Sequence, residues 1–296
     1  MEAHLNPIGA NTWIWVSPLT DGRLETLAPR VAGWGFDLIE LPVENPSDWN
    51  PDHAAETLAE NGLGATVCAV MPPGRELAGA DHATVEATRD YVRRCIDAAA
   101  TVAGGGTSGV VAGPLYTSVG RTWRMDAAGR ATLLNELVES LRTLADYAGE
   151  QDVRLAVEPL NRFETSVINT AEQALEVIER VDSSACGLLL DTFHMNIEER
   201  DPAAAILSAG SRLAHFHACA NDRGAPGKDH IDWAGISTAL AKVRYTGPVC
   251  VESFTSENEA IATAAAIWRP LAQSQDEIAT NGLAFLRSAL QELDGQ

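Results

Sequence analysis

The chain has 296 residues, of which 46% are hydrophobic and 21% charged, and its formal net charge at pH 7 is −20. This composition is ordinary for a globular protein with a large core and gives no indication of disorder. So negative a charge disfavours nucleic acid or an anionic membrane as a partner, because binding to phosphates requires a surplus of lysine and arginine. It is also mildly unfavourable for a phosphorylated substrate.

Neither secretion nor membrane insertion has support in the sequence. The N-terminus lacks a basic segment followed by an apolar one, and no apolar run approaches the roughly 20 residues of a membrane span. The five cysteines are an odd number, widely spaced, with no C-x-x-C pair. We expect them to be buried free thiols of a cytoplasmic protein.

Strands and helices are predicted to alternate along the first half of the chain. Strands are expected at residues 8–16, 36–43, 64–71 and 108–112, and helices at 23–34, 51–60, 81–102 and 126–149. Gly35 follows the first helix at a position where a left-handed backbone favours glycine. The glycine run 104–106 precedes a strand rather than a helix N-terminus, so we interpret it as a turn and not as a phosphate loop. The loop through Tyr116 and Trp123 is long enough to fold over a pocket.

The second half repeats the alternation. Predicted strands end at Glu158, Asp191, His217 and Glu252, and helices are expected at 170–181, from about 201, at 233–243 and over most of 257–293. The four strand ends are 33, 26 and 35 residues apart, close to the roughly 31 residues of each unit in a (β/α)8 barrel. We therefore predict an α/β fold, with one (β/α)8 TIM barrel domain over residues 1–296 and a C-terminal helical extension.

Each of these four strands is an apolar run that stops at a residue able to bind a metal. Taken singly, each residue has a structural explanation: Asp191 as a helix N-cap, Glu158 as a loop carboxylate, and His215 and His217 as core histidines on one face of their strand. Four such endings at regular spacing favour one divalent-cation site instead. Carboxylate ligands suit Mn2+ or Mg2+, although Cys219 leaves a softer, zinc-like site as an alternative.

A cation held by three carboxylates and one imidazole, with open positions, can bind two neighbouring oxygens of a polyol or hydroxyketone. It would polarise the carbonyl group and acidify the adjacent C–H bond. One carboxylate could then remove the proton from one face, and a second could return a proton to the opposite face, which inverts the centre. Glu158 and Glu252 are candidates for this pair as well as for ligands.

Several segments carry a family resemblance. They are EPLNRFE at 158–164, LDTFHMNIEE at 190–199, HFH at 215–217, Arg223 with PGK at 226–228, and ESF at 252–254. Together they closely resemble the D-tagatose 3-epimerase / D-psicose (D-allulose) 3-epimerase family of xylose isomerase-like barrels, most strongly between residues 153 and 254. The resemblance implies reversible epimerisation at C3 of a free ketose through a cis-enediolate. It also implies one Mn2+, Mg2+ or Co2+ ion, with Mn2+ expected first, and a homodimer or homotetramer.

The resemblance also assigns roles by position. It makes Glu158, Asp191, His217 and Glu252 the metal ligands, with the two glutamates as the proton-transfer pair. It makes Glu164, His194 and Arg223 contacts to the O1 and O2 end of the sugar, and Phe254 an apolar wall beside the substrate. From the residues alone, Arg223 would be a surface loop charge, Glu164 a helix or loop carboxylate, and Phe254 rim packing.

Two regions depart from the D-psicose enzymes and leave the preferred ketose open. One is the stretch 218–222, which lacks the acidic residue that those enzymes usually have between the histidine and the arginine. The other is 10–13, which lacks their tyrosine-rich pattern. Both regions could shape the pocket for C4 to C6. Cys68, Tyr116 and Trp123 are weak candidates for the C4–C6 end of the sugar, with a structural role as the alternative for each.

Four other functions stay open, the first two within the same barrel superfamily. An aldose–ketose isomerase or a ketose-phosphate epimerase would use a similar barrel and cation. A nuclease resembling endonuclease IV would share the fold but needs three zinc ions and a surface that attracts DNA. A non-catalytic barrel would bind sugar without converting it.

Overall fold

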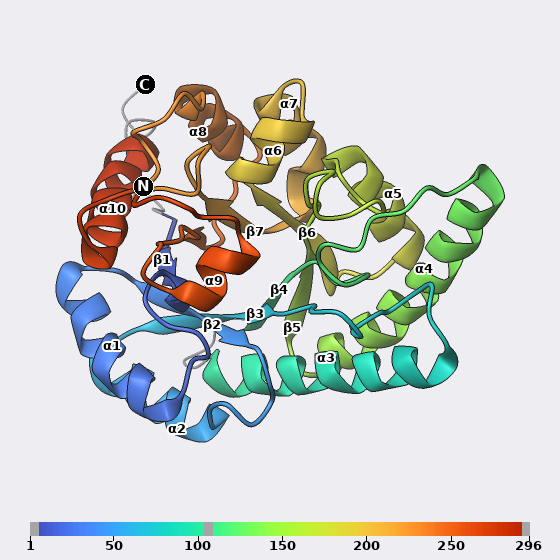
Figure 1. The fold of residues 1–296 in the computed structure, drawn as a ribbon, viewed down its shortest axis with the longest axis horizontal. Helices are drawn as coiled ribbons and strands as arrows, with labels where there is room; N and C mark the ends of the chain where they lie inside the picture. Colours follow the sequence, from blue (N-terminus) through green and yellow to red (C-terminus); the bar gives the residue numbers. More distant parts are fainter. Residues whose placement is uncertain (1–5, 104–108, 292–296) are drawn as a thin grey trace.

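Eight parallel strands close into a barrel in the computed structural model, which describes residues 6–103 and 109–291 (Figure 1). Each strand pairs with its sequence neighbours, and β1 closes the ring by pairing with β8. The strands are β1 Ile8–Asn11, β2 Leu38–Val43, β3 Gly64–Ala69, β4 Gly109–Gly113, β5 Val153–Val157, β6 Cys186–Asp191, β7 Leu213–Ala218 and β8 Val249–Val251. The predicted (β/α)8 barrel is therefore confirmed.

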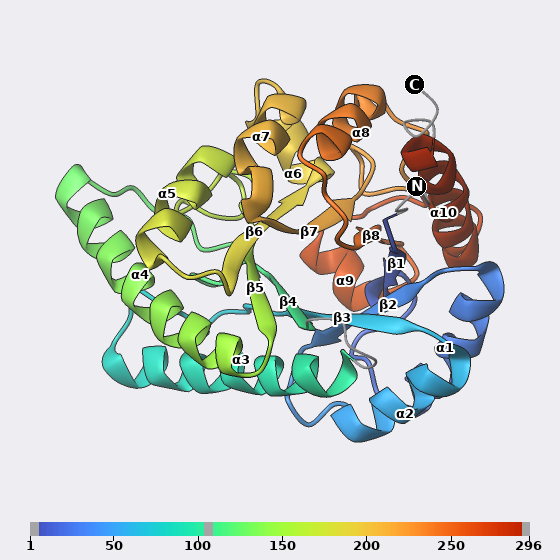
Figure 2. The same ribbon diagram turned by 180° about the vertical axis from the view of Figure 1, so that it is seen from behind.

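Helices surround the barrel, and α9 lies in front of its mouth in the view of Figure 1, while Figure 2 shows the opposite side. They are α1 Asp21–Trp34, α2 Pro51–Asn61, α3 His82–Val102, α4 Ala127–Glu150, α5 Ala171–Val181, α6 Thr192–Glu198, α7 Pro202–Ala209, α8 Trp233–Lys242, α9 Glu259–Ala264 and α10 Gln275–Gln291. Short 3-10 turns occupy Thr12–Ile14 and Gly210–Arg212. None of the described helices is both long and apolar enough to cross a membrane.

The core lies between the strands and the helical ring, because every strand is covered on both faces and almost all strand residues are buried. A second, small apolar cluster consists of Val110, Ala112, Ala156, Leu189 and Ala214. Ala156 and Leu189 stand two residues before Glu158 and Asp191, so they face the same inner side of the barrel. This cluster forms the floor beneath the strand ends.

Three sequence predictions need correction. β1 ends at Asn11 rather than at residue 16, because the Asn11 side chain accepts a hydrogen bond from the backbone N–H of Trp13 and starts a 3-10 turn. Helix α6, which directly follows β6, was foreseen only through the alternative that Asp191 is a helix N-cap. The helix expected over most of 257–293 is interrupted between α9 and α10, where Ala266 has a positive φ of 56° and Pro270 follows.

Most other boundaries agree with the predictions within two residues, and Gly35 is the left-handed C-cap of α1 with φ 94°. The predicted turn at residues 104–106 lies outside the described residues. All five cysteines are buried and free, as expected.

Candidate metal centre and active site

Four side chains meet at the carboxyl ends of four neighbouring strands. Asp191 is the last residue of β6 and His217 is the penultimate residue of β7. Glu158 and Glu252 directly follow β5 and β8. All four are buried, and one ligand atom from each lies within 4.8 Å of the others. Parallel strands in a closed barrel place their carboxyl ends on one face, which is why residues up to 94 positions apart converge here.

Two buried atoms in this group have no hydrogen-bond partner among the described residues, Glu158 Oε1 and His217 Nδ1. They are 3.8 Å apart, and His217 Nδ1 is 3.4 Å from Glu252 Oε2. An unpaired buried polar atom costs about 1–3 kcal/mol. Three carboxylates and one imidazole with unused lone pairs therefore fit a divalent cation bound mainly by oxygen.

The charges of the group are strongly coupled. Burial raises the pKa of Glu158 to about 8 and that of Asp191 to about 6. Burial also acts to raise the pKa of Glu252, but His217 and Arg223 beside it bring that pKa below its usual value. Burial acts to lower the pKa of His217, yet Glu252 and Glu40 hold it well above its usual value. Without a cation, the group therefore retains protons that a bound cation would have to replace.

Arg223 is buried at the edge of this group, so its expected place as a surface loop charge is wrong. Its Nη1 donates to Asp191 Oδ2 at 2.6 Å and to Glu252 Oε2 at 3.2 Å. The guanidinium group lies between the rings of Phe193 and Phe254, 4.1 and 4.9 Å from their centroids. The aromatic rings and the two carboxylate partners together allow the charged guanidinium group of Arg223 to remain buried.

His194 projects from α6 toward the same group. The backbone N–H of Asn161 donates to His194 Nδ1 at 3.1 Å, and the Nη2 of Arg223, which can only donate, lies 3.0 Å from Nε2, so both ring nitrogens face donors. Burial, followed by Arg223 and His217, lowers the pKa of His194 well below its usual value. The imidazole is therefore neutral, and its Nε2 lies 3.8 Å from Glu158 Oε1.

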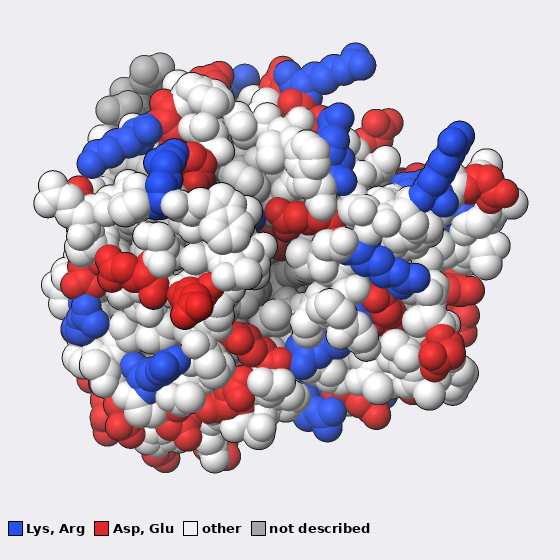
Figure 3. Space-filling model, viewed as in Figure 1, with Lys and Arg blue, Asp and Glu red and all other residues white. Residues whose placement is uncertain are grey.

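A cavity of about 480 Å³ opens above these residues, and Figure 3 shows a hollow near the middle of the face drawn. Glu164, His194, Arg223, Phe254 and Cys68 line it. The half-buried Glu164 accepts a hydrogen bond from Asn161 Nδ2 at 2.7 Å. The remaining lining residues are mostly apolar and include Trp13, Met71, Val119, Phe163 and Ile261.

Two weak candidates lie away from this cavity. Trp123 packs beneath the Arg121 guanidinium, 4.5 Å from its ring centroid, and is absent from the cavity lining. Tyr116 is fully buried and donates its hydroxyl to the backbone oxygen of Glu158 at 2.8 Å. The structure therefore gives both residues packing roles.

Sequence reasoning missed Glu40, Phe193 and Asn161, whereas Trp13 belongs to the stretch 10–13 that was expected to shape the pocket and does line the cavity. Glu40 did carry a signal, because it is a charge in the middle of the apolar strand β2. It is fully buried, and its carboxylate contacts both His215 and His217. Phe193 carried no signal, since an aromatic side chain is usually core.

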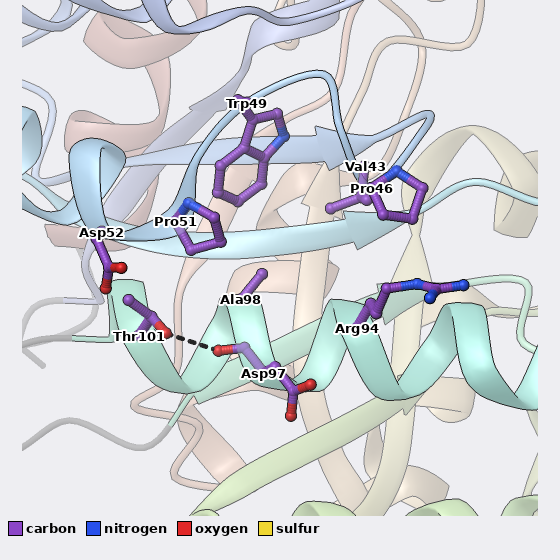
Figure 4. A pocket seen from close by; sticks show the side chains of 9 residues that line it. All are labelled: Val43, Pro46, Trp49, Pro51, Asp52, Arg94, Asp97, Ala98 and Thr101. Carbon is purple, nitrogen blue, oxygen red and sulfur yellow. Dashed lines mark hydrogen bonds between the residues drawn. The ribbon is translucent and has the colours of Figure 1, made fainter.

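A second hollow of about 270 Å³ lies on the outer surface between the β2–α2 connection and α3 (Figure 4). Its polar side chains are Asp52, Arg94, Asp97 and Thr101, and the Thr101 hydroxyl already donates to the backbone oxygen of Asp97. None of the four candidate ligands lines it. It shows no convergence of unpaired polar groups and is distinct from the barrel mouth.

Comparison with known proteins gives consistent matches over nearly the whole chain. A family described as "Xylose isomerase-like TIM barrel" matches residues 29–288. The chain is 34% identical over 285 residues to a probable ketose 3-epimerase of Synechocystis sp. and 30% identical over 285 residues to a ketose 3-epimerase of Arthrobacter globiformis, with 96% of each chain covered in both cases. A solved L-ribulose 3-epimerase superposes with a TM-score of 0.90 at 30% identity, over 99% of both chains.

Proposed function

Because the chain belongs to the xylose isomerase-like TIM barrel family, we propose that it is a metal-dependent 3-epimerase of a free ketohexose or ketopentose. The observation that carries this proposal is the convergence of four buried ligand-type side chains, two of which have a buried atom with no hydrogen-bond partner. The names of its relatives supply the reaction class.

Glu158, Asp191, His217 and Glu252 would hold one divalent cation. Oxygen-rich ligands favour Mn2+, with Mg2+ and Co2+ as alternatives. When bound, the cation would supply Lewis-acid polarisation of the substrate carbonyl. Cys219, the softer alternative ligand, is not in the group of atoms that meet at this point.

The protein would move the protons through two glutamates. Glu158 and Glu252 follow β5 and β8, three strands apart around the ring, and both approach His217 Nδ1. One carboxylate would take the C3 proton and the other would deliver a proton to the opposite face of the resulting cis-enediolate. Each such acid or base contributes on the order of 10²- to 10⁴-fold to the rate.

The substrate end near O1 and O2 would be held by three polar groups. The imidazole of His194 can form a hydrogen bond with its oxygens, the guanidinium of Arg223 can donate to them, and the Glu164 carboxylate can accept from a hydroxyl group. Phe254 and Cys68 would form part of the wall. The largely apolar remainder of the cavity leaves the preferred ketose to be decided by assay.

The rival functions are disfavoured by the charges. Among the described residues that line the cavity, Arg223 alone is a Lys or Arg, and its Nη1 already pairs with two carboxylates. One guanidinium whose charge is largely balanced by carboxylates is a weak site for a phosphate group, which argues against a ketose-phosphate epimerase. The net charge of −20 likewise argues against a nuclease. A homodimeric or homotetrameric assembly and a cytoplasmic location stay predictions.

Isotope incorporation tests the reaction directly. The protein is incubated with Mn2+, Mg2+ or Co2+ in D2O with D-fructose, D-tagatose or L-ribulose, and with fructose 6-phosphate as the phosphorylated comparison. A 3-epimerase should place deuterium at C3 of a free ketose and leave the phosphate ester unchanged. Deuterium at C1 or C2 would indicate an isomerase instead, and no exchange with any ketose would indicate a binding protein.

A further inference from the structure

Glu40 lies in the interior of the barrel, in the middle of β2, where an ionisable side chain has no solvent. Four groups surround its carboxylate. Asn11 Nδ2 donates to Oε1 at 3.0 Å, and Thr66 Oγ1 donates to Oε2 at 2.9 Å. His217 Nε2 lies 2.9 Å from Oε1, and His215 Nε2 lies 2.8 Å from Oε2.

These contacts decide the ionisation state of Glu40. Oε1 accepts a hydrogen bond from Asn11 and Oε2 accepts one from Thr66, so both oxygens act as acceptors, as those of an ionised carboxylate do. An ionised carboxylate can only accept hydrogen bonds. The nitrogen of His217 that faces it must therefore be the donor.

The consequence for His217 follows from its two nitrogens. In the metal-bound protein the imidazole is neutral and carries one ring proton, so donation from Nε2 to Glu40 leaves Nδ1 without a proton. Nδ1 is the atom that points toward Glu158 and Glu252 and has no other partner. A histidine ligand binds metal through the nitrogen that lacks the proton.

We propose that Glu40 is a positioning residue that fixes the ring orientation and tautomer of His217, so that Nδ1 is presented to the cation. The inference rests on the proposed metal-dependent function. His215 supports the arrangement, since it contacts the other carboxylate oxygen and packs edge-on against His217, with ring centroids 4.9 Å apart. Carboxylate partners of histidine ligands typically change metal affinity by 10- to 100-fold.

Two other clusters contain Glu40, one with His215 and Cys250 and one with Cys68 and Glu252. Neither fits a second cation as well as it fits the positioning role. The two Glu40 oxygens already face four protein groups, and the 2.8 Å between His215 Nε2 and Oε2 leaves no room for an ion between them.

Titration with Mn2+ alone tests the proposal, with free Mn2+ followed by electron paramagnetic resonance. Glu40→Gln, which keeps the shape but removes the charge, should bind Mn2+ about 10- to 100-fold more weakly than the unaltered protein. Glu76→Gln is the matched control, because Glu76 is also buried and hydrogen-bonded, to Ser118, but lies outside the group. Its Mn2+ affinity should stay within about twofold. Equal affinity for Glu40→Gln and the unaltered protein would overturn the proposal.

A second measurement uses the unaltered protein, so it does not depend on whether a variant folds. The unaltered protein is labelled with 15N-histidine and loaded with Mg2+, a diamagnetic cation, at a concentration that displaces Mn2+. The His217 ring should show a protonated Nε2 and an unprotonated Nδ1, and the reverse pattern would overturn the assignment. If the unaltered protein bound neither cation, the proposed function would fail together with this inference. If the unaltered protein bound the cation and Glu40→Gln bound it equally well, only the inference about Glu40 would fail.

Discussion

Asp191 can fill both of the roles that the sequence left as alternatives. Its Oδ1 accepts the backbone N–H of Phe193 at 2.7 Å and so caps α6, while its Oδ2 meets Arg223 at 2.6 Å beside the other candidate ligands. A carboxylate has two oxygens with about four lone-pair positions, so capping and coordination do not compete. The helix cap thus fixes the direction of the oxygen that faces the site.

Glu158→Gln and Glu252→Gln should each reduce epimerisation by about 10²- to 10⁴-fold, because an amide cannot take or return a proton at C3. Each should also weaken Mn2+ binding. Deuterium exchange at C3 measures the first effect, and Mn2+ titration the second.

Glu199→Gln is the control for these two variants, since Glu199 is half-buried and accepts the backbone N–H of Ala171, away from the site. It should retain activity. Full activity in either active-site variant would remove that glutamate from the proton-transfer pair.

His194→Ala should mainly impair substrate binding. The side chain is neutral and can form one hydrogen bond with the substrate, and the loss of one such hydrogen bond costs about 0.5–1.5 kcal/mol. We expect KM to rise up to about tenfold, with a smaller change in kcat. The exposed His53, which pairs with Glu25, provides the control variant His53→Ala. A loss confined to kcat would place His194 in the chemical step instead.

Cation binding should release protons. Burial raises the pKa of Glu158 to about 8, and the pKa of His217 is held well above its usual value, so both keep a proton at pH 7 in the metal-free protein. Ligands must be deprotonated to bind metal. Apparent Mn2+ affinity should therefore rise with pH, by about tenfold per unit for each proton released, and level off above the pKa of the released groups.

Calorimetry at pH 7 in buffers of different ionisation enthalpy counts these protons. We expect between one and two for each Mn2+ ion. No release, together with an affinity that stays flat between pH 6 and pH 8, would show that the ligands are already deprotonated.

Helix α6 shows why part of the site escaped sequence prediction. It has only seven residues and begins directly at the end of β6, with no intervening loop to mark a boundary. Yet this helix places His194 one turn beyond Asp191. The ligand-type residues at strand ends were predictable because an apolar strand that stops at a charge is a local pattern, whereas the burial of Arg223 depends on Phe193 and Phe254, which are 61 residues apart in the chain.

Gly113, at the end of β4, should not tolerate a side chain. Its φ is 135°, and an added Cβ would lie 2.6 Å from the backbone oxygen of Ala69 on β3. We expect Gly113→Ala to lower the free energy of unfolding by about 2–4 kcal/mol, since backbone strain and overpacking each cost about 1–3 kcal/mol. Denaturant unfolding measures this change.

Gly33→Ala is the opposite control. Gly33 lies in α1, is exposed and has no atom near an added Cβ, so alanine should stabilise the protein by about 0.5–1 kcal/mol. A neutral Gly113→Ala would mean that β3 and β4 separate easily at the mouth of the barrel.

The closed barrel explains why most of the architecture was predictable. Parallel strands buried on both faces are near-continuous apolar runs, and their regular spacing along the chain is visible in the sequence. The course of the segment between α9 and α10 was not predictable, because its left-handed Ala266 depends on tertiary packing. The acidic surface and the cavity with a single arginine belong to the assembled molecule and become visible only there.

Anomalous diffraction from crystals grown with Mn2+ tests the central claim most directly. The account predicts one manganese peak at the carboxyl end of the barrel, within about 2.0–2.3 Å of an oxygen of Glu158, Asp191 and Glu252 and of Nδ1 of His217. A peak between Glu40, His215 and Cys250, or one coordinated through Nε2 of His217, would contradict it.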